Sequence, residues 1–154
     1  MCALKCVQPN LNKKRNLAMP RLETWPRLLA TSIEKARSRP FVWGIHDCPT
    51  FAFETRMILT DGEDVAALWR GTYSTHLGGL RVMRRLGWQT LEDMGRALLG
   101  APRSDALLAQ RGDIVLTDTG LGFGVVIGAT AIGMAPEGMR FAPLTSSRFA
   151  WAAS

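Results

Sequence analysis

The sequence has 154 residues, of which 47% are hydrophobic and 21% are charged, with a net charge of +6 and a pI near 9.9. This length suits one domain, and the apolar content excludes an intrinsically disordered chain. The three cysteines, with no apolar leader at the start, argue against a secreted disulfide framework, and no apolar run is long enough to span a membrane. We therefore expect a protein made in the cytoplasm.

Residues 1–20 are predicted to form a basic N-terminal arm, and residues 21–154 a single folded domain. The arm is polar, carries the run Lys13-Lys14-Arg15, and shows no amphipathic period. Its two cysteines, Cys2 and Cys6, are soft ligands but too few to hold a metal ion or an iron–sulfur cluster. We therefore expect no cofactor and no metal site.

Helical patterns dominate the first two thirds of the domain. Asp47 is a good N-cap, and Pro49 fits the first turn of the helix that follows it. Thr90 and Asp93 have the spacing of a capping box. The predicted helices cover residues 23–37, 47–59, 64–69, 75–86 and 90–99.

Short apolar strands replace the helical patterns after Pro102. Residues 113–117 and 122–127 predict two strands, and the turn signal at residues 136–138 predicts a hairpin between residues 130–134 and 139–141. Residues 146–151 are expected to form a short tail. Because the helices come first and a small antiparallel sheet follows, the sequence indicates an α+β domain.

Cys48 is the residue whose chemistry is most distinctive. It follows His46 and Asp47 at the start of a predicted helix, where unpaired N–H groups and the helix dipole stabilise a thiolate and lower the thiol pKa. A cysteine nucleophile also needs a base, normally a histidine, within hydrogen-bond reach, and a third group that orients the base. The alternative is a small buried cysteine with no chemistry.

The segment Trp43-Gly44-x-x-Asp47-Cys48-x-x-Phe51 resembles the nucleophile segment of the NlpC-type papain-like cysteine peptidases, in which an Asp-Cys pair begins the central helix. Residues 111–116, Arg-Gly-Asp-Ile-Val-Leu, look like the Gly-Asp-hydrophobic strand of that superfamily. The resemblance extends over residues 25–145. It implies a papain-like fold, with Cys48 at the start of the central helix and N-terminal helices packed on a small antiparallel sheet.

A phage-encoded offshoot of this superfamily, of unknown function, is similar in more detail. Its members carry Trp-Gly-x-His-Asp-Cys, then Arg-Gly-x-Tyr, which is found here at residues 70–73, and then Arg-Gly-Asp. They resemble products of genes that lie beside tail-tip genes. The resemblance implies a structural component of a phage tail tip or baseplate, made in the host cytoplasm and carried in the virion. Its implied partners are other tail-tip proteins, such as the hub and the distal tail protein.

Gly122 departs from the pattern of the active peptidases. The strand at residues 122–128 looks like one that reads His-Val-Gly-Ile-x-x-Gly in active members, so Gly122 stands at the catalytic histidine position. The only two histidines are His46 and His76, and neither lies in the strand region. The resemblance therefore implies a scaffold without peptidase chemistry. The alternative is a cysteine peptidase or amidase that acts on peptidoglycan stem peptides during phage entry, with Cys48 as nucleophile and His46 as base.

The remaining conspicuous residues have plainer interpretations. His76 is expected at the surface or as a helix cap, and Asp113 as a turn residue that accepts backbone N–H groups. Nucleic acid is not an expected partner, because the basic charge comes without a recognition helix or base-stacking motif. Four aromatic residues are predicted to belong to the core, namely Trp43, Phe51, Trp69 and Trp88. Three arginines are predicted to anchor acidic neighbours, namely Arg70, Arg84 and Arg111.

Overall fold

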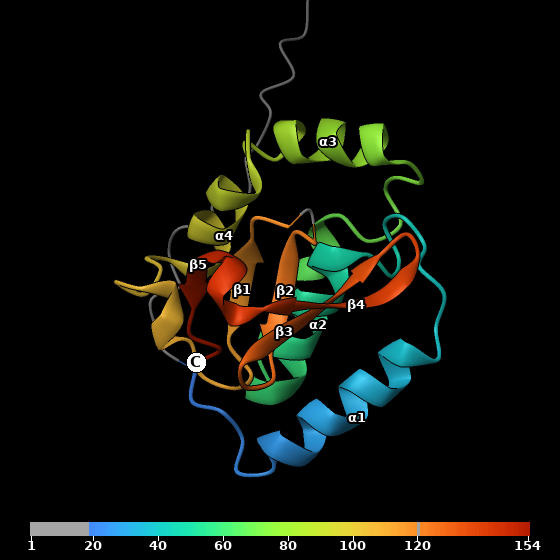
Figure 1. The fold of residues 1–154 in the computed structure, drawn as a ribbon. Helices are drawn as coiled ribbons and strands as arrows, with labels where there is room; N and C mark the ends of the chain where they lie inside the picture. Colours follow the sequence, from blue (N-terminus) through green and yellow to red (C-terminus); the bar gives the residue numbers. More distant parts are fainter. Residues whose placement is uncertain (1–18, 120) are drawn as a thin grey trace, which may run out of the picture.

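The computed structural model describes residues 19–119 and 121–154. The predicted arm therefore lies outside the described residues except for its last two positions, and so do Cys2 and Cys6. Figure 1 shows the helices in the first part of the chain and the strands in the last part. The helices are α1 (Trp25–Arg37), α2 (Cys48–Thr60), the 3₁₀ helix η1 (Val65–Leu68), α3 (His76–Arg85) and α4 (Leu91–Leu99).

Local capping explains why α2 and α4 begin within one residue of the predicted positions. The Asp47 side chain accepts a hydrogen bond from the Thr50 amide at 3.2 Å, and Pro49 occupies the first turn of α2. Thr90 and Asp93 form the expected capping box at the start of α4. The start of α2, which places Cys48, is therefore determined by residues within one turn of it.

The last part of the chain forms one antiparallel sheet with the strand order β4-β3-β2-β1-β5. Its strands are β1 (Ile114–Thr117), β2 (Phe123–Val126), β3 (Thr130–Ala135), β4 (Gly138–Pro143) and β5 (Ser147–Trp151). Short 3₁₀ helices, η2 (Ala106–Leu108) and η3 (Leu144–Ser146), precede β1 and β5. The predicted α+β class is confirmed.

The expectation of a simple tail at residues 146–151 is wrong. These residues form β5, which pairs with β1 so that Ile114 lies opposite Trp151. The Trp151 indole N–H donates to the Gly100 carbonyl at 3.0 Å, and the ring is 1% exposed. A five-residue edge strand is recognisable only through its partner, and this partner lies at least thirty residues earlier in the chain.

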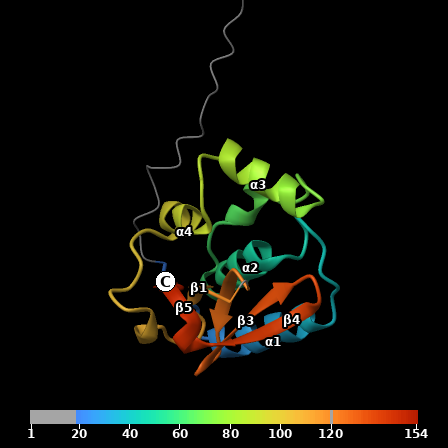
Figure 2. The same ribbon diagram turned by 45° about the horizontal axis from the view of Figure 1, so that its top comes forward.

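Helix α2 packs against β2 and β3, and α1 packs against α2 (Figure 2). The main core lies between these helices and the sheet, with Leu29, Phe53 and Phe123 fully enclosed. A second, smaller cluster that includes Val115 and Val126 covers the opposite face. Because both faces are buried, β1 and β2 read as continuous apolar runs. In the described part of the chain, no helix is both long and apolar enough to cross a membrane.

Candidate functional site

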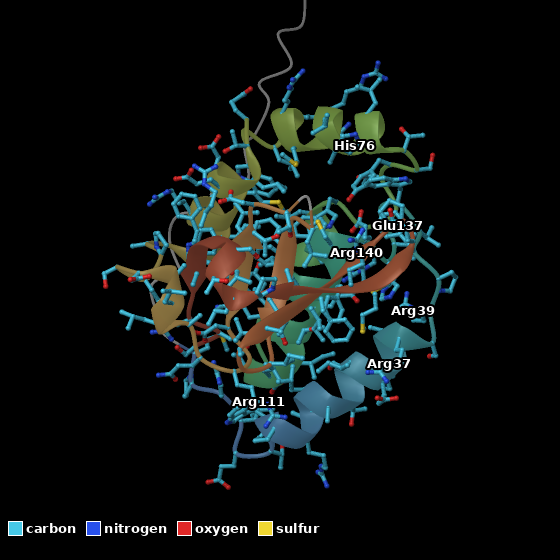
Figure 3. All side chains as sticks on the ribbon, viewed as in Figure 1. Arg37, Arg39, His76, Arg111, Glu137 and Arg140 are labelled. Atoms are coloured by element: carbon cyan, nitrogen blue, oxygen red, sulfur yellow. The ribbon has the colours of Figure 1, made fainter. Side chains whose placement is uncertain are left out.

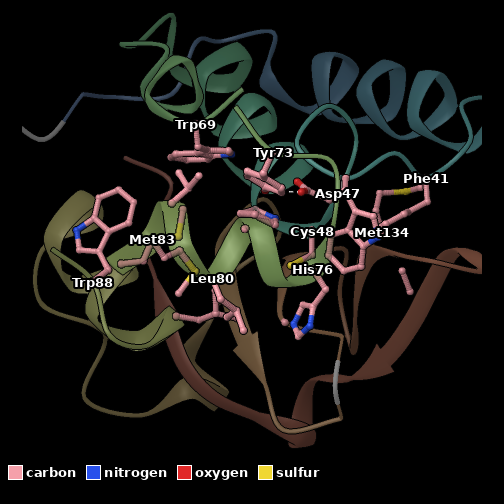
Figure 4. A pocket seen from close by; sticks show the side chains of 18 of the residues that line it. Phe41, Asp47, Cys48, Trp69, Tyr73, His76, Leu80, Met83, Trp88 and Met134 are labelled. Atoms are coloured by element: carbon pink, nitrogen blue, oxygen red, sulfur yellow. Dashed lines mark hydrogen bonds between the residues drawn. The ribbon is translucent and has the colours of Figure 1, made fainter. Parts of the chain in front are cut away.

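Asp47 fixes the entrance to α2 through hydrogen bonds from three directions. Its buried carboxylate accepts from the Thr50 hydroxyl at 2.6 Å, from the Gly44 amide at 2.8 Å and from the Tyr73 hydroxyl (Figure 4). Burial, and then the bond to Asp47, raise the pKa of Tyr73, so its phenol stays protonated and acts as a donor. The position of Cys48, the next residue, is therefore held by a fully paired carboxylate.

The Arg-Gly-x-Tyr segment at residues 70–73 supports this same entrance. The Gly71 amide donates to the Gly44 carbonyl at 2.9 Å. The Arg70 guanidinium binds both carboxylate oxygens of Asp64, at 2.8 and 2.9 Å, and its Nε donates to Glu54 at 2.9 Å. The segment therefore braces the loop that leads into Cys48.

The three arginines predicted to anchor acidic neighbours have different surroundings. Arg70 is bound by two carboxylates of its own chain and is not available to a partner. The Arg111 guanidinium lies 5.9 Å from the centroid of the Trp25 ring, at the α1 side of the domain (Figure 3). Arg84 is exposed on α3 and forms no ion pair with a described residue. Of these three arginines, Arg84 alone is exposed and has neither an ion pair nor a ring contact with a described residue.

Cys48 lines an apolar cavity of about 200 Å³ (Figure 4). Its wall also includes residues of α3, the segment just before β2 and the end of β3. The wall is made mostly of aromatic, aliphatic and thioether side chains. Trp69 and Trp88 are 2% and 4% exposed, so the prediction that they belong to the core is confirmed, but they also face this cavity. Trp43 is half-buried in the same wall, whereas Phe51 is buried elsewhere in the core.

Gly122 lies directly across from the thiol, as predicted. A Cβ atom placed on Gly122 would lie 2.7 Å from the Cys48 Sγ atom, closer than real Cβ contacts come. The φ angle of Gly122 is +73°, in the left-handed region that favours glycine. A side chain here would therefore require both a strained backbone and movement of the thiol, so the site is built around glycine.

The Cys48 thiol is held in its neutral form. Burial raises its pKa to about 12, the Asp47 carboxylate adds to the rise, and the Phe123 amide opposes it. The expected lowering by the helix N-terminus is outweighed, because apolar side chains and a neighbouring anion disfavour the thiolate. At neutral pH the sulfur is thus part of the apolar wall.

His46 does not share the cavity with Cys48. It is 2% exposed, its Nε2 lies 3.2 Å from the Ala36 carbonyl of α1, and its ring meets the edge of Phe51. Burial lowers the pKa of His46, and the charge of Arg39 lowers it further. The structure therefore directs the predicted base toward α1 and does not bring it together with Cys48.

His76 is the histidine that does line the Cys48 cavity. It begins α3, is exposed as predicted, and its ring centroid lies 5.4 Å from that of Trp43. Within residues 19–119 and 121–154, no hydrogen bond joins either imidazole to the thiol. The helical spacing of His76, Leu80 and Met83, which all line the cavity, is the sequence signal that could have placed His76 there.

Asp113, at the other end of α2, is a structural carboxylate. It accepts the backbone amides of Gln110 and Ala153, at 2.8 and 3.1 Å, as predicted. It also forms ion pairs with Arg21 at 2.6 Å and Arg103 at 2.7 Å, which sequence reasoning missed because the arginines come from distant segments. Its side chain is completely buried, and four donors satisfy it.

Comparison with known proteins identifies a family but no activity. A family model described as a domain of unknown function, DUF6950, matches residues 20–153 and so includes both Cys48 and Asp113. No curated protein and no solved structure matches the chain. In the described residues, no three His, Cys, Asp or Glu side chains gather in a way that could hold a metal ion.

Proposed function

The chain belongs to the DUF6950 family, and from this premise we propose that it is a binding module without hydrolytic activity, a structural component of a phage tail tip or baseplate. In this proposal the domain keeps a papain-like scaffold, with Cys48 at the start of its central helix, and uses it to contact other tail-tip proteins such as the hub and the distal tail protein. The assignment to the tail rests on the resemblance of the residue 43–51, 70–73 and 111–116 segments to phage-encoded relatives of the NlpC-type peptidases.

The absence of hydrolysis rests on one observation, the contact of Gly122 with the Cys48 thiol. A cysteine nucleophile needs a base within hydrogen-bond reach, and such a base contributes about 10²- to 10⁴-fold to the rate. The glycine leaves no space for an imidazole on that side. The raised pKa of Cys48 acts in the same direction, because it removes the thiolate at neutral pH.

A cysteine peptidase or amidase that cleaves peptidoglycan stem peptides during phage entry is the second candidate. One observation favours it, which is that His76 lines the same cavity as Cys48. The base would then be His76 rather than His46, because the His46 ring contacts α1. This candidate requires the cavity to rearrange so that the exposed imidazole of His76 comes within hydrogen-bond reach of the half-buried Cys48.

Thiol reactivity separates the two candidates. In a variant with Cys2→Ala and Cys6→Ala, we expect alkylation of Cys48 by iodoacetamide to keep rising with pH above 10, whereas a free thiol levels off above its pKa of about 8.5. The same preparation should release no stem-peptide fragments from purified sacculi. Rapid alkylation at neutral pH, together with fragment release that Cys48→Ala abolishes, would establish the enzyme instead.

Phage assembly tests the assignment to the tail. We expect phage carrying Cys48→Ala to give a normal titre, because the thiol has no catalytic task. Deletion of residues 1–18 should lower the titre and leave incomplete tails, visible by electron microscopy. A normal titre without the arm, or a collapse with Cys48→Ala alone, would contradict the proposal.

A further inference from the structure

We propose that the cavity beside Cys48 receives one large apolar side chain from an acidic protein partner, and that arginines on the outer face of α3 bind the carboxylates of that partner. This inference rests on the proposed function and adds the chemistry of the partner to it.

The size of the cavity sets the size of the guest. Its volume of about 200 Å³ exceeds the roughly 150 Å³ of an engineered apolar cavity that stays dry and binds benzene. One aromatic ring or branched aliphatic side chain therefore fits, whereas a long acyl chain does not.

The walls suit an apolar guest. Two indoles, Trp69 and Trp88, and two thioethers, Met83 and Met134, line the space, and thioethers adapt to different shapes. The neutral Cys48 thiol adds another polarisable surface.

The buried polar side chains around Asp47 are already paired with one another. The Tyr73 hydroxyl donates to Asp47, whose carboxylate also accepts the Thr50 and Gly44 amides. The Trp69 indole N–H donates to the Thr50 hydroxyl at 3.1 Å. An apolar side chain entering the cavity would therefore leave these groups paired, and so would avoid the cost of breaking their hydrogen bonds.

Helix α3 separates the cavity from solvent and is amphipathic. Leu80 and Met83 face the cavity, while Leu77, which is 56% exposed, and Arg81 lie on the outer face. Figures 1 and 4 show that α3 lies at one end of the domain and forms one side of the cavity. A partner that reached into the cavity would therefore contact α3, and we infer that it extends onto the outer face of this helix.

The charges on α3 indicate the charge of that partner. The helix carries Arg81, Arg84 and Arg85, all exposed, and no acidic residue. In residues 19–119 and 121–154, no ion pair joins these three arginines to a carboxylate. Two other helices differ, since Arg96 pairs with Glu92 in α4 and Arg37 with Glu34 in α1.

Arginine binds carboxylates through a planar pair of donors, and three unpaired guanidiniums on one helix attract an acidic surface. Interfaces commonly combine an aromatic anchor in a desolvated pocket with a charged rim around it. The cavity supplies the pocket and the α3 arginines supply the rim. An acidic segment with a central aromatic or branched aliphatic residue matches both.

Binding of designed peptides tests the inference directly. The probe is a fluorescein-labelled peptide, Glu-Glu-Asp-Gly-Phe-Gly-Asp-Glu-Glu, titrated with the full chain and followed by fluorescence anisotropy. We expect saturable binding that weakens with added salt, and an affinity about tenfold lower when alanine replaces the central phenylalanine, which corresponds to about 1.4 kcal/mol. A peptide with lysines in place of its acidic residues should not bind.

Variants of the protein separate the pocket from the rim. Met83→Trp fills the cavity and should abolish the preference for phenylalanine over alanine. Arg84→Glu should weaken binding of both acidic peptides about tenfold. The matched control is Arg37→Glu, which changes an exposed arginine in the last turn of α1 and should leave the affinity within about twofold.

A measurement on the unmodified cavity covers the case in which Met83→Trp fails to fold. In the protein with Cys2→Ala and Cys6→Ala, bound phenylalanine peptide should slow the reaction of Cys48 with 4,4′-dithiodipyridine at least about tenfold, because the guest covers the sulfur. The alanine peptide should slow it much less.

Three results would overturn the inference: no binding of the phenylalanine peptide at millimolar concentration, equal affinity for the phenylalanine and alanine peptides, or binding to anionic phospholipid vesicles in preference to the peptide. These failures are distinguishable from failure of the proposed function. Cys48-dependent cleavage of sacculi would contradict the proposed function. If the sacculi are not cleaved and one of the three results is found, only the proposal of an acidic partner with an apolar side chain is contradicted.

Discussion

The two ends of α2 are built from opposite chemistry. Near its C-terminal end, where the Leu59 carbonyl accepts the Leu22 amide, the buried Asp113 carboxylate has two arginines and two backbone amides as partners. At its N-terminal end, Cys48 borders an apolar cavity and has no ionic partner. One end is a closed set of charges, and the other is an apolar space with room for a guest.

This difference assigns separate tasks to the two motifs that the sequence makes conspicuous. A buried carboxylate with every lone pair occupied rigidifies the structure but offers no site to a ligand. An apolar cavity whose wall includes a neutral thiol offers space for an apolar guest. The Arg-Gly-Asp segment therefore stabilises the domain, and the Asp-Cys segment forms part of the cavity for which we propose a partner.

The largest effect is expected from removing the charge at the closed end. Asp113→Ala should lower the free energy of unfolding by about 3 kcal/mol, because it leaves Arg21 and Arg103 without their partner and two backbone amides unpaired. Urea denaturation followed by circular dichroism measures it. The control is Asp118→Ala, which breaks an ion pair exposed on both sides and should cost less than about 1 kcal/mol. If Asp113→Ala and Asp118→Ala lower the free energy of unfolding equally, the buried carboxylate is not the stabilising group that distinguishes this end of α2.

A smaller effect is expected from adding one methyl group at the open end. Gly122→Ala should cost about 2 kcal/mol, because it combines left-handed backbone strain with a close contact to the Cys48 sulfur. Gly71→Ala is the matched control, since its φ of +75° is nearly the same but no atom lies within 4 Å of the added Cβ, so only the strain of about 1 kcal/mol applies.

A double-mutant cycle isolates the contact itself. The loss in free energy of unfolding caused by Gly122→Ala should be about 1 kcal/mol smaller when residue 48 is alanine. The loss caused by Gly71→Ala should not depend on residue 48. If the effects of Gly122→Ala and Cys48→Ala on the free energy of unfolding are strictly additive, the glycine and the thiol are not in contact. The proposed absence of hydrolysis would then lose the observation that supports it.

The smallest effect is the pH dependence contributed by His46. Burial keeps the pKa of this imidazole below its usual value, so the unfolded chain binds a proton that the folded chain does not. The free energy of unfolding should therefore fall as the pH drops through about 6.5, the ordinary histidine pKa. The slope between pH 7 and pH 5 should therefore flatten in His46→Gln. An unchanged slope in His46→Gln would mean that the ring takes up a proton in place.

Local chemistry made a large part of this structure predictable. Asp47, Pro49 and the Thr90–Asp93 pair act on backbone groups within one turn, so they mark helix starts without reference to the rest of the fold. The apolar runs of β1 and β2 can also be recognised from the sequence, because a strand buried on both faces shows no alternation of polar and apolar residues. The facing of Gly122 and Cys48 was also foreseen, through the order of the motifs rather than through any local signal.

What the sequence by itself determined is therefore the α+β class, the helix starts and the position of a thiol at the mouth of α2. Tertiary structure alone decided that Ser147–Trp151 is a strand, that Asp113 binds two arginines, and that the His46 ring lies against α1. Each of these depends on contacts between separate segments of the chain. Such contacts also remove water from Cys48, and this burial raises its pKa. Because burial arises only when distant segments pack together, no local sequence pattern predicts it.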